Sequence, residues 1–395
     1  MKFSLAVENV IVVRNTKTEV SMDSTRDHWY DELCKLPIAK GKCETVQVVS
    51  EDPLFILYTS GSTGKPKAIV HTHGGYQVGT YITLKQCFDI KEEDRWWCTA
   101  DPGWINGHSY LVYGPLLNGA TVFMHEGGPT YPYPDGWWQL IEHYGITSFY
   151  TAPTAIRTLM RFGDAWVRKH DLSSLRVLGS VGESINPEAW RWFHDVVGDG
   201  TCPITDTWWQ TETGMFQITT VPSMPLKPGA AGRPVAVVDE EGHELPAGKE
   251  GFLVLKNPWP AMMRTLYKDP DRYLEAYWTK YPGVYLTGDS ARIDDDGYIW
   301  IIGRADDVIK VSGHRIGTAE VESALIFHPA VAEAAAIGLP HEVKRNAIHM
   351  VVVLNHSFEP TKNLVSDIRG HVAETLSPIA KPDTIEFVDK LPKTR

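Results

Sequence analysis

The segment LYTSGSTGKPK, residues 57–67, continues an apolar run that begins at Leu54. Two glycines, Gly61 and Gly64, let backbone N–H groups approach an anion closely, and the neighbouring hydroxyls and lysines add hydrogen-bond donors and positive charge. A strand followed by such a loop is typical of a triphosphate cradle. It is not the P-loop of the common NTPases, because that motif needs four residues between its first glycine and Gly-Lys, and here there are two. A flexible Ser/Gly turn is the alternative interpretation.

Short apolar runs on both sides of this loop alternate with amphipathic stretches of helical length. The runs are residues 10–13, 53–58, 120–123, 148–151 and 175–178. This alternation predicts an α/β fold, with layered and largely parallel sheets. The sequence contains no internal repeat and no heptad run, which excludes solenoids and coiled coils.

The sequence pattern changes twice towards the C-terminus. From about residue 227 the strand-like segments are rich in turns, with hairpin signals at 239–242, 246–248 and 294–297, and they predict an antiparallel or barrel-like subdomain. After Arg304 come a charged segment, a helix over 318–327 that starts at a capping Thr318 followed by Val321 and Glu322, and a strand over 348–354. We expect a hinge near Asp306, and therefore two domains, residues 1–304 and 305–395.

Composition limits the class of protein and of partner. A chain of 395 residues suggests two or three domains at roughly 150 residues each. With 43% hydrophobic and 22% charged residues it is neither disordered nor collagen-like. A formal charge of −11 argues against nucleic acid and anionic membranes as partners, so an anionic ligand needs a local site.

The cysteines and the N-terminal sequence indicate the cellular compartment in which the protein is expected. Five cysteines without CxxC spacing argue against a disulfide framework and a structural zinc site, and favour a reducing compartment. The first apolar stretch is broken by Glu8 and Asn9, which is too short for a signal peptide or a membrane span. We expect a cytoplasmic protein. Paired tryptophans, such as Trp208-Trp209, are more often packing residues than ligand contacts.

The loop YTSGSTGKPK resembles the signature loop of the acyl-adenylate-forming enzymes, the superfamily of acyl-CoA synthetases, luciferases and peptide-synthetase adenylation domains. Further resembling segments follow in the family's order, and they are similar to the acetyl-CoA synthetase branch in particular. They are WWCTADPGWINGHSYLVYGPLLNGAT, YTAPTAIRTL, VLGSVGESINPEAW, DTWWQTETG, YLTGD and GRADDVIKVSGHRIGTAEVE. The resemblance covers nearly the whole chain.

This resemblance implies a large adenylate-forming domain of layered α/β sheets with a β-rich subdomain, followed by a small, mobile α+β C-terminal domain. It also implies a reaction in two steps. A carboxylate first attacks the α-phosphate of ATP to give acyl-AMP and diphosphate, and coenzyme A then takes the acyl group. Because two anions meet in the first step, catalysis is mostly charge neutralisation and positioning. The implied partners are acetate, ATP and coenzyme A, with Mg²⁺.

The resemblance also assigns residues to the nucleotide. Glu212 would bind Mg²⁺, Thr211 would approach the α-phosphate, and both act in catalysis together with Lys67. The residues implied for the β and γ phosphates are Thr59, Ser60, Gly61, Ser62, Thr63, Gly64 and Lys67. Those implied for adenine are Gly182, Glu183, Ser184, Asp206, Thr207 and Trp208, and Trp209 and Gln210 are implied as further contacts of ATP or AMP. Asp289 would take both ribose hydroxyls, with Arg304 beside it, and Arg315 would reach phosphate through its planar fork.

The acyl and coenzyme A sites follow in the same way. Trp209 would close a small acyl pocket that is also lined by Ile105, Asn106 and Val181, which favours acetate, with propionate tolerated, over longer acids. The coenzyme A positions are Asn106, Thr130, Ser312 and Gly313. A second, structural cation is implied at Ile326, His328 and Val331, where the two apolar residues offer only backbone carbonyls.

Some positions depart from the family. Ser184 stands where Pro is usual, Thr130 where Asn is common and Ala373 where Arg is usual, while Asn106 replaces a Thr of the acyl pocket. The relatives carry an additional N-terminal portion, and after residues 391–395 they continue with Ser-Gly-Lys, whose lysine serves adenylation. We therefore expect a chain truncated at both ends, with a complementing chain or fragment as a possible partner.

Several hypotheses follow. The first is an AMP-forming acetate–CoA ligase. The alternatives are an ATP- or AMP-binding remnant without ligase activity and a ligase for another short acid such as propionate. A peptide-synthetase adenylation domain is disfavoured, because Trp209 leaves no room for an amino-acid side chain.

Overall fold

The structure is a computed structural model that describes residues 7–59, 65–232, 235–305, 307, 309–311, 314–341, 345–355 and 358–391. The chain divides into two compact units, Met1–Val48 and Val49–Arg395. In the first unit, strands β1 (Val10–Val12) and β2 (Asp27–Trp29) pair in parallel and are followed by α1 (Tyr30–Leu33) and the 3₁₀ turn η1 (Pro37–Lys40). The strand expected at 10–13 is confirmed, and it pairs within this small unit.

A six-stranded sheet of order β10-β9-β8-β7-β5-β6 is the centre of the second unit. Its strands are β5 (Arg95–Cys98), β6 (Thr121–Phe123), β7 (Ser148–Thr151), β8 (Val177–Val181), β9 (Ile204–Trp208) and β10 (Ile218–Thr219). All neighbours are parallel except β9 and β10. The expected parallel α/β layer is therefore confirmed, with the strand expected at 175–178 shifted towards the C-terminus.

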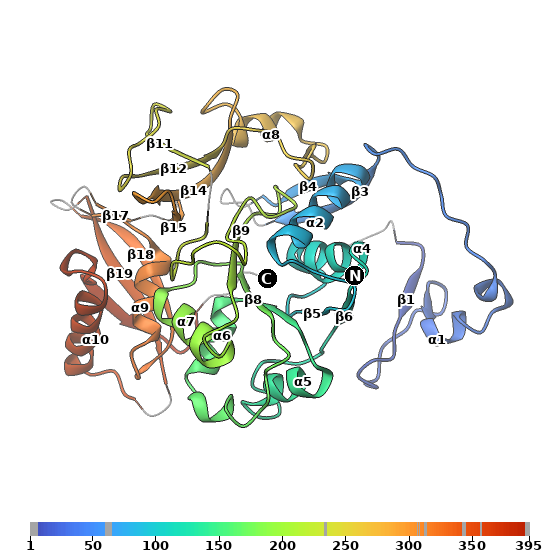
Figure 1. Ribbon diagram of the computed structural model, residues 1–395, viewed down its shortest axis with the longest axis horizontal. Helices are drawn as coiled ribbons and strands as arrows, with labels where there is room; N and C mark the ends of the chain where they lie inside the picture. The colour runs from blue at the N-terminus through green and yellow to red at the C-terminus, as the bar shows by residue number, and fades with distance from the viewer. Residues whose placement is uncertain are drawn as a thin grey trace. The chain divides into compact units, whose positions relative to one another are not determined.

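Helices cover both faces of this sheet (Figure 1). Helix α2 (His73–Cys87) lies on one face, and α5 (Gly136–Tyr144), α6 (Pro153–Met160) and α7 (Pro187–Trp192) lie on the other. The shorter helical segments between the strands are α3 (Ile105–Gly107), η2 (His108–Tyr113), α4 (Gly114–Leu117), η3 (Asp164–Trp166) and η4 (Phe193–Val197).

Side-chain alternation along the strands explains the two covered faces. Trp96 packs with Phe88 of the α2 side, whereas its neighbour Trp97 packs with Trp137 of α5. All four rings are nearly fully buried. Because successive residues of a strand point to opposite faces, a pair of adjacent tryptophans can fill both cores at once.

The strand that precedes the signature loop belongs to a different, antiparallel sheet. Here β3 (Pro53–Thr59) pairs with β4 (Lys67–Thr72), and β4 pairs with β13 (Thr265–Leu266). The strand at 53–58 is therefore one of the exceptions to the largely parallel pairing that the alternation predicts. The connection between β3 and β4 has seven residues, 60–66, which is shorter than a parallel crossover needs.

A four-stranded antiparallel sheet of order β11-β12-β14-β15 follows, and it confirms the predicted change after residue 227. Its strands are β11 (Ala236–Val238), β12 (Glu250–Leu255), β14 (Tyr285–Ile293) and β15 (Ile299–Arg304). Helix α8 (Pro270–Tyr277) lies between β13 and β14 in sequence and contacts both.

The C-terminal part has a sheet in which β19 pairs with β16, β18 and β20, and β16 also pairs with β17. Its elements are β16 (Ile309–Val311), β17 (His314–Ile316), α9 (Thr318–Ile326), β18 (Val331–His341), β19 (Arg345–Leu354), α10 (Lys362–Thr375), η5 (Pro378–Ala380) and β20 (Thr384–Phe387). The helix expected over 318–327 and the strand over 348–354 are confirmed.

The start of α9 differs from the expected capping arrangement. Gly317 is the N-cap, and no side chain caps the helix. The Glu322 carboxylate instead accepts a hydrogen bond from the backbone N–H of Ala336 in β18, at 2.9 Å. Glu322, which a local capping pattern would use at the start of the helix, therefore hydrogen-bonds the neighbouring strand instead. The domain boundary between residues 304 and 305 stays a prediction, because the chain between them is continuous within the second unit.

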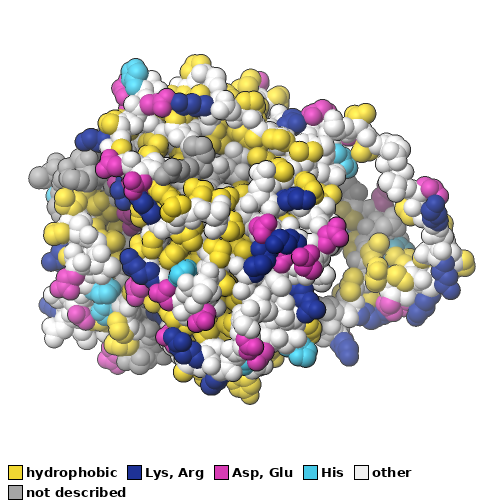
Figure 2. Space-filling view, in the orientation of Figure 1, with side chains coloured by type: hydrophobic (Ala, Val, Ile, Leu, Met, Phe, Trp, Pro, Cys, Tyr) yellow, Lys and Arg dark blue, Asp and Glu magenta, His cyan; other side chains and the backbone are white. Residues whose placement is uncertain are grey.

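No helix in the described ranges has the length and apolar character that crossing a lipid bilayer requires. On the face of the molecule shown in Figure 2, Lys and Arg side chains are interspersed with Asp and Glu.

Gly179 of β8 offers a test of the central sheet. A Cβ at this position would lie 2.5 Å from the Phe88 ring, inside a close-packed core. We expect Gly179→Ala to lower the free energy of unfolding by about 1–3 kcal/mol, measured as a fall in melting temperature. Gly370→Ala in α10, where the new Cβ has open space, is the control and should be neutral or slightly stabilising. Equal melting temperatures for the two variants would contradict the packing described here.

Candidate active site

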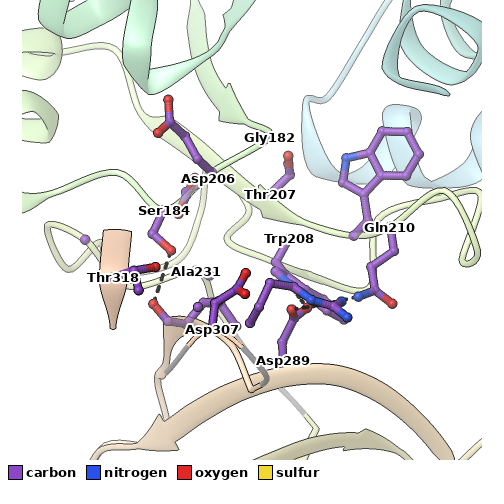
Figure 3. Close-up of a pocket in the computed structure, with 16 residues that line it drawn as sticks. Gly182, Ser184, Asp206, Thr207, Trp208, Gln210, Ala231, Asp289, Asp307 and Thr318 are labelled. Atoms are coloured by element: carbon purple, nitrogen blue, oxygen red, sulfur yellow. Dashed lines mark hydrogen bonds and ion pairs between the residues drawn. The ribbon is translucent and has the colours of Figure 1, made fainter. Parts of the chain in front are cut away.

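A cavity of about 350 Å³ lies beside the carboxyl ends of β8 and β9, which is where ligands bind in open α/β sheets. It is lined by every residue expected to contact adenine and by both residues expected to contact ribose (Figure 3). The lining residues that the resemblance assigned to the nucleotide are Gly182, Glu183, Ser184, Asp206, Thr207, Trp208, Trp209, Gln210, Asp289 and Arg304. Residues that lie more than one hundred positions apart in sequence therefore share one cavity.

The Asp289 carboxylate is fixed by groups from three elements. Its Oδ2 accepts hydrogen bonds from the Trp208 indole N–H at 3.1 Å and from the Gln210 side-chain amide at 3.0 Å, and these two side chains converge on it in Figure 3. Arg304 lies directly opposite Asp289 in the β14–β15 pairing, and its guanidinium is 3.5 Å from Oδ1. A short carboxylate held in this way is suited to accept two vicinal hydroxyls.

Asp206 is fully buried in β9, and its carboxylate accepts a hydrogen bond from the Ser180 hydroxyl of β8. Burial raises the pKa of Asp206 to about 7. Near neutral pH the side chain is therefore present in both protonation states, and the protonated form donates a hydrogen bond as well as accepting one.

Glu183 does not present its carboxylate to the cavity freely. It accepts hydrogen bonds from the backbone N–H of Thr154 at 2.7 Å and from the buried guanidinium of Arg157 at 2.8 Å, both from α6. Ser184, the family's Pro position, donates its hydroxyl to the Ile301 carbonyl of β15 at 3.1 Å. Sequence reasoning missed Arg157, although a charged residue on the apolar face of an amphipathic helix is itself a signal of a buried partner.

Most of the signature loop lies outside the described residues, namely Ser60, Gly61, Ser62, Thr63 and Gly64. The two ends of the loop are described. There, Thr59 at the end of β3 and Lys67 at the start of β4 lie opposite each other in the strand pairing. Arg272 of α8 donates hydrogen bonds to the Lys65 carbonyl at 2.7 Å and to the Pro66 carbonyl at 3.3 Å. The C-terminal end of the loop is thus tied to α8, a contact that no sequence pattern indicated.

The three residues expected in catalysis lie close to one another. The Lys67 ammonium is 3.2 Å from Glu212 Oε1, and the Tyr277 hydroxyl donates to the same carboxylate oxygen at 2.7 Å. Thr211 is buried beside Glu212, and its carbonyl hydrogen-bonds His71 Nε2 at 2.7 Å. Burial lowers the pKa of His71 to about 4, so the ring is neutral at physiological pH and Nε2 carries the proton that it donates. His71 and Tyr277 were not expected from the sequence.

The expected acyl residues surround Trp209. Its ring packs against one core cluster that includes Val181 and against another that includes Ile105. It also meets the Tyr110 ring edge to face, at 5.0 Å between centroids. Asn106 is buried next to Ile105, and its amide oxygen has no hydrogen-bond partner among the described residues. A buried polar atom of this kind is what a small polar ligand would satisfy.

The expected coenzyme A residues are not brought together in the described part of the chain. Thr130 is half-buried in a turn after β6 and does not line the cavity. Ser312 and Gly313 lie outside the described residues, as does Asp306, and Arg315 is described only as part of the backbone of β17. Two other residues of the C-terminal part, Asp307 and Thr318, do line the cavity.

The two expected metal positions differ in their donors. The described residues contain no group of three or more His, Cys, Asp or Glu side chains placed to hold an ion. Glu212 nevertheless suits Mg²⁺, because this ion is commonly bound by one or two carboxylates together with the phosphates of a substrate. A lone buried carboxylate beside the phosphate loop has the required chemistry.

The second cation position, at Ile326, His328 and Val331, does not fit a metal ion. Arg161 of α6 donates to the Ile326 carbonyl at 2.9 Å and to the Val331 carbonyl at 2.7 Å, and the His328 carbonyl accepts from the Val331 N–H at 2.9 Å. The His328 ring is used as well, since Nε2 is 3.1 Å from Asp367. A guanidinium thus supplies the positive charge that the sequence assigned to an ion.

Two protein-family models and several curated proteins match this chain. A family model described as AMP-binding enzyme matches residues 4–267, and one described as AMP-binding enzyme C-terminal domain matches residues 320–395. The chain is 55% identical to the acetyl-coenzyme A synthetase of Chlorobaculum tepidum over 99% of this chain, and 54% identical to that of Rubrobacter xylanophilus over the same share. The chain spans about 60% of the length of these relatives, 60% and 61% respectively.

Among solved structures, the chain is similar to an anthranilate CoA ligase in complex with anthranoyl-AMP. The TM-score is 0.75 at 30% sequence identity, and the match covers 89% of this chain and 67% of that one. The expected adenylate-forming fold is confirmed. The roles of the individual site residues stay predictions that the geometry supports.

The raised pKa of Asp206 makes stability depend on pH. Between pH 3.8 and about 7 the folded protein keeps a proton that the unfolded chain releases, so stability falls as the pH rises through this window and levels off above it. Asp206→Asn cannot ionise and should escape this loss, roughly 1 kcal/mol per pH unit. Melting temperatures of variant and wild type at pH 5 and pH 8 measure it. The exposed Asp389→Asn is the control, and an Asp206→Asn advantage that does not grow with pH would contradict the assignment.

The Arg161 contacts give a second prediction. Arg161→Ala should leave the Ile326 and Val331 carbonyls without their charged donor, so local opening around residues 326–331 becomes easier. We expect backbone amide hydrogen exchange in this segment to rise severalfold, with no restoration by Mg²⁺. Arg168→Ala removes a nearby exposed arginine that pairs with Asp164 instead, and it should have no such effect. Slower exchange of the wild-type segment on adding Mg²⁺ would show that an ion binds there after all.

Proposed function

The chain belongs to the AMP-binding enzyme family, and on this premise we propose that it is an AMP-forming acetate–CoA ligase. The reaction converts ATP, acetate and coenzyme A to acetyl-CoA, AMP and diphosphate through an acetyl-adenylate. The observation that supports this best is the single cavity that gathers the expected adenine and ribose residues in a chain so similar to acetyl-coenzyme A synthetases.

The nucleotide would be oriented from its ribose end. Asp289 accepts both ribose hydroxyls, because Trp208 and Gln210 already fix its carboxylate and prevent it from turning away. Adenine lies in the same cavity, against the backbone of residues 182–184 and the face of Trp208. The buried Asp206 stands at the end of this slot, where its carboxyl can meet the polar edge of a base.

The phosphates would then point towards the β3–β4 loop. Lys67 leaves that loop at its C-terminal end and supplies positive charge, and Thr59 supplies a hydroxyl at the other end. The Thr59 hydroxyl is buried and has no hydrogen-bond partner within the described ranges, so it is available as a donor. Mg²⁺ on Glu212 would neutralise phosphate charge when bound. Together these groups lower the repulsion between the incoming carboxylate and the α-phosphate.

The acyl group would lie against Trp209. This ring closes the pocket from the β9 side, and Ile105 and Val181 are buried around it. A methyl group fits such a space, whereas each further methylene must displace packed side chains. We therefore propose acetate as the preferred acid, with propionate as a weaker one.

Transfer to coenzyme A depends on the C-terminal part. Asp307 and Thr318 already reach the cavity, which is consistent with a segment that contributes to the second step. We propose that Ser312, Gly313, Thr130 and Asn106 contact coenzyme A and that Arg315 contacts phosphate, and these assignments rest on the family resemblance. A cytoplasmic location is proposed from the five cysteines, none of which forms a disulfide in the structure.

Acetate-dependent exchange of labelled diphosphate into ATP tests the first step on this chain. We expect exchange that requires acetate and Mg²⁺ and that falls by at least tenfold in Glu212→Gln. ATP binding without any exchange would contradict the ligase proposal and favour the alternative of a nucleotide-binding protein without ligase activity. Binding of ATP is measured in parallel by calorimetry, so that the two outcomes are distinguished.

Acyl preference is tested by Trp209→Gly. Removing the indole opens the volume that a longer chain needs, so the ratio of butyrate to acetate in the exchange assay should rise by about tenfold or more. The ATP affinity should change little, and the melting temperature shows whether the variant is folded. A folded variant with an unchanged preference for acetate would refute the assignment of the pocket.

A further inference from the structure

Helix α8 (Pro270–Tyr277) contributes two contacts to the phosphate side of the site that the sequence did not indicate. At its beginning, Arg272 binds the carbonyls of Lys65 and Pro66 at the end of the signature loop. At its last residue, the Tyr277 hydroxyl reaches both Lys67 and Glu212. The helix therefore contacts the C-terminal end of the loop and the two charged residues beside it, Lys67 and Glu212.

Tyr277, Lys67 and Glu212 form a closed triangle of contacts. The Lys67 ammonium donates to the Tyr277 oxygen at 2.5 Å, and the Tyr277 hydroxyl donates to Glu212 Oε1 at 2.7 Å. The third side is the ion pair of Lys67 with Glu212, at 3.2 Å. The phenol thus accepts from the cation and donates to the anion, which orients both.

Burial makes this arrangement energetically important. Tyr277 is 4% exposed and Glu212 is 9% exposed, so the carboxylate needs a compensating charge. Burial, reinforced by the nearby Glu212 charge, raises the pKa of Tyr277 well above its usual value. The hydrogen bond that the phenol donates to Glu212 is itself buried, away from competing water.

The Tyr277 ring is itself fixed. It stacks on Tyr285 of β14, with 5.4 Å between centroids and 8° between planes. The Tyr285 hydroxyl donates to the Gln210 amide oxygen at 3.1 Å, and Gln210 holds Asp289. A continuous set of contacts thus joins the Lys67–Glu212 pair to the carboxylate at the ribose end. One connected set of side chains would therefore position both the ribose and the phosphates of a bound nucleotide.

From these contacts we propose that Tyr277 is a positioning residue for the adenylation step. It holds Glu212 in place while Lys67 exchanges its carboxylate partner for the phosphates of ATP. Lys67 balances the Glu212 charge before the nucleotide binds. Lys67 would then be free to turn to the phosphates of ATP, while the hydrogen bond from Tyr277 keeps the Glu212 carboxylate in place, where it would hold Mg²⁺. This inference rests on the proposed function.

The test compares Tyr277→Phe with Tyr273→Phe. Tyr277→Phe keeps the ring and its stacking and removes only the hydroxyl. Tyr273 lies one turn earlier on α8 and packs against Tyr277 and Trp278, and its hydroxyl makes no hydrogen bond to Lys67 or Glu212 in the described structure. Both variants should melt within a few degrees of the wild type, which establishes that they are folded.

The first readout does not depend on activity. Trace acetylation with acetic anhydride, followed by mass spectrometry of peptides, reports how freely the Lys67 amine reacts, with the exposed Lys249 as the internal reference. Because Tyr277→Phe removes one partner of the ammonium, Lys67 labelling should rise about threefold or more relative to the wild type and to Tyr273→Phe. Unchanged labelling would overturn the proposal.

The second readout is acetate-dependent diphosphate exchange. Tyr277→Phe should lower its maximal rate about 10- to 100-fold and raise the Mg²⁺ concentration needed for half-maximal rate, with the acetate KM within twofold of the wild type. Tyr273→Phe should match the wild type. A normal rate and Mg²⁺ dependence in Tyr277→Phe would also overturn the proposal. If the wild type shows no exchange, the proposed function fails, while the labelling result still decides whether Tyr277 orients Lys67.

Discussion

The buried carboxylate of Glu212 is the constraint on which the rest of the site depends. Glu212 lies in the connection between β9 and β10, Lys67 begins β4, and Tyr277 ends α8, so the charge is compensated only if three distant segments of the chain meet. An unpaired carboxylate with so little exposure would be strongly destabilising. The same requirement brings the antiparallel β3–β4 pair, which carries the signature loop, against the end of the parallel sheet.

A second fixed carboxylate, Asp289, lines the cavity. It comes from the antiparallel sheet, whereas Trp208 and Gln210, which hold it, come from the end of β9 and the residues that follow it. The cavity is thus lined by residues from two sheets of different type. Tyr277 and Tyr285 stack on each other and link the two carboxylates, because Tyr277 donates to Glu212 and Tyr285 donates to Gln210, which in turn donates to Asp289.

Helix α6 plays a comparable part towards the C-terminal elements. Arg157 and the backbone of Thr154 hold Glu183 beside the cavity, and Arg161, one turn further, holds the carbonyls that follow α9. A change in the position of α9 would therefore be transmitted to the adenine side through a single short helix. The same guanidinium supplies positive charge to two of the carbonyls that the resemblance assigned to a structural ion.

The sequence by itself determined the α/β class and the change to antiparallel strands after residue 227, because apolar alternation and turn signals carry this information along the chain. On resemblance alone it assigned Asp289, Trp208 and Gln210 to nucleotide binding, and these three residues line one cavity of the structure. Only the tertiary structure decided the antiparallel pairing of β3, the use of Glu322 as a partner for β18, and the roles of Tyr277, His71 and Arg161. Each of these depends on the packing of segments far apart in sequence. A tyrosine at the end of a helix or an arginine in an amphipathic helix has no distinctive local sequence pattern. Its hydrogen-bond partner is set only by tertiary packing, because buried charges and polar groups must be paired.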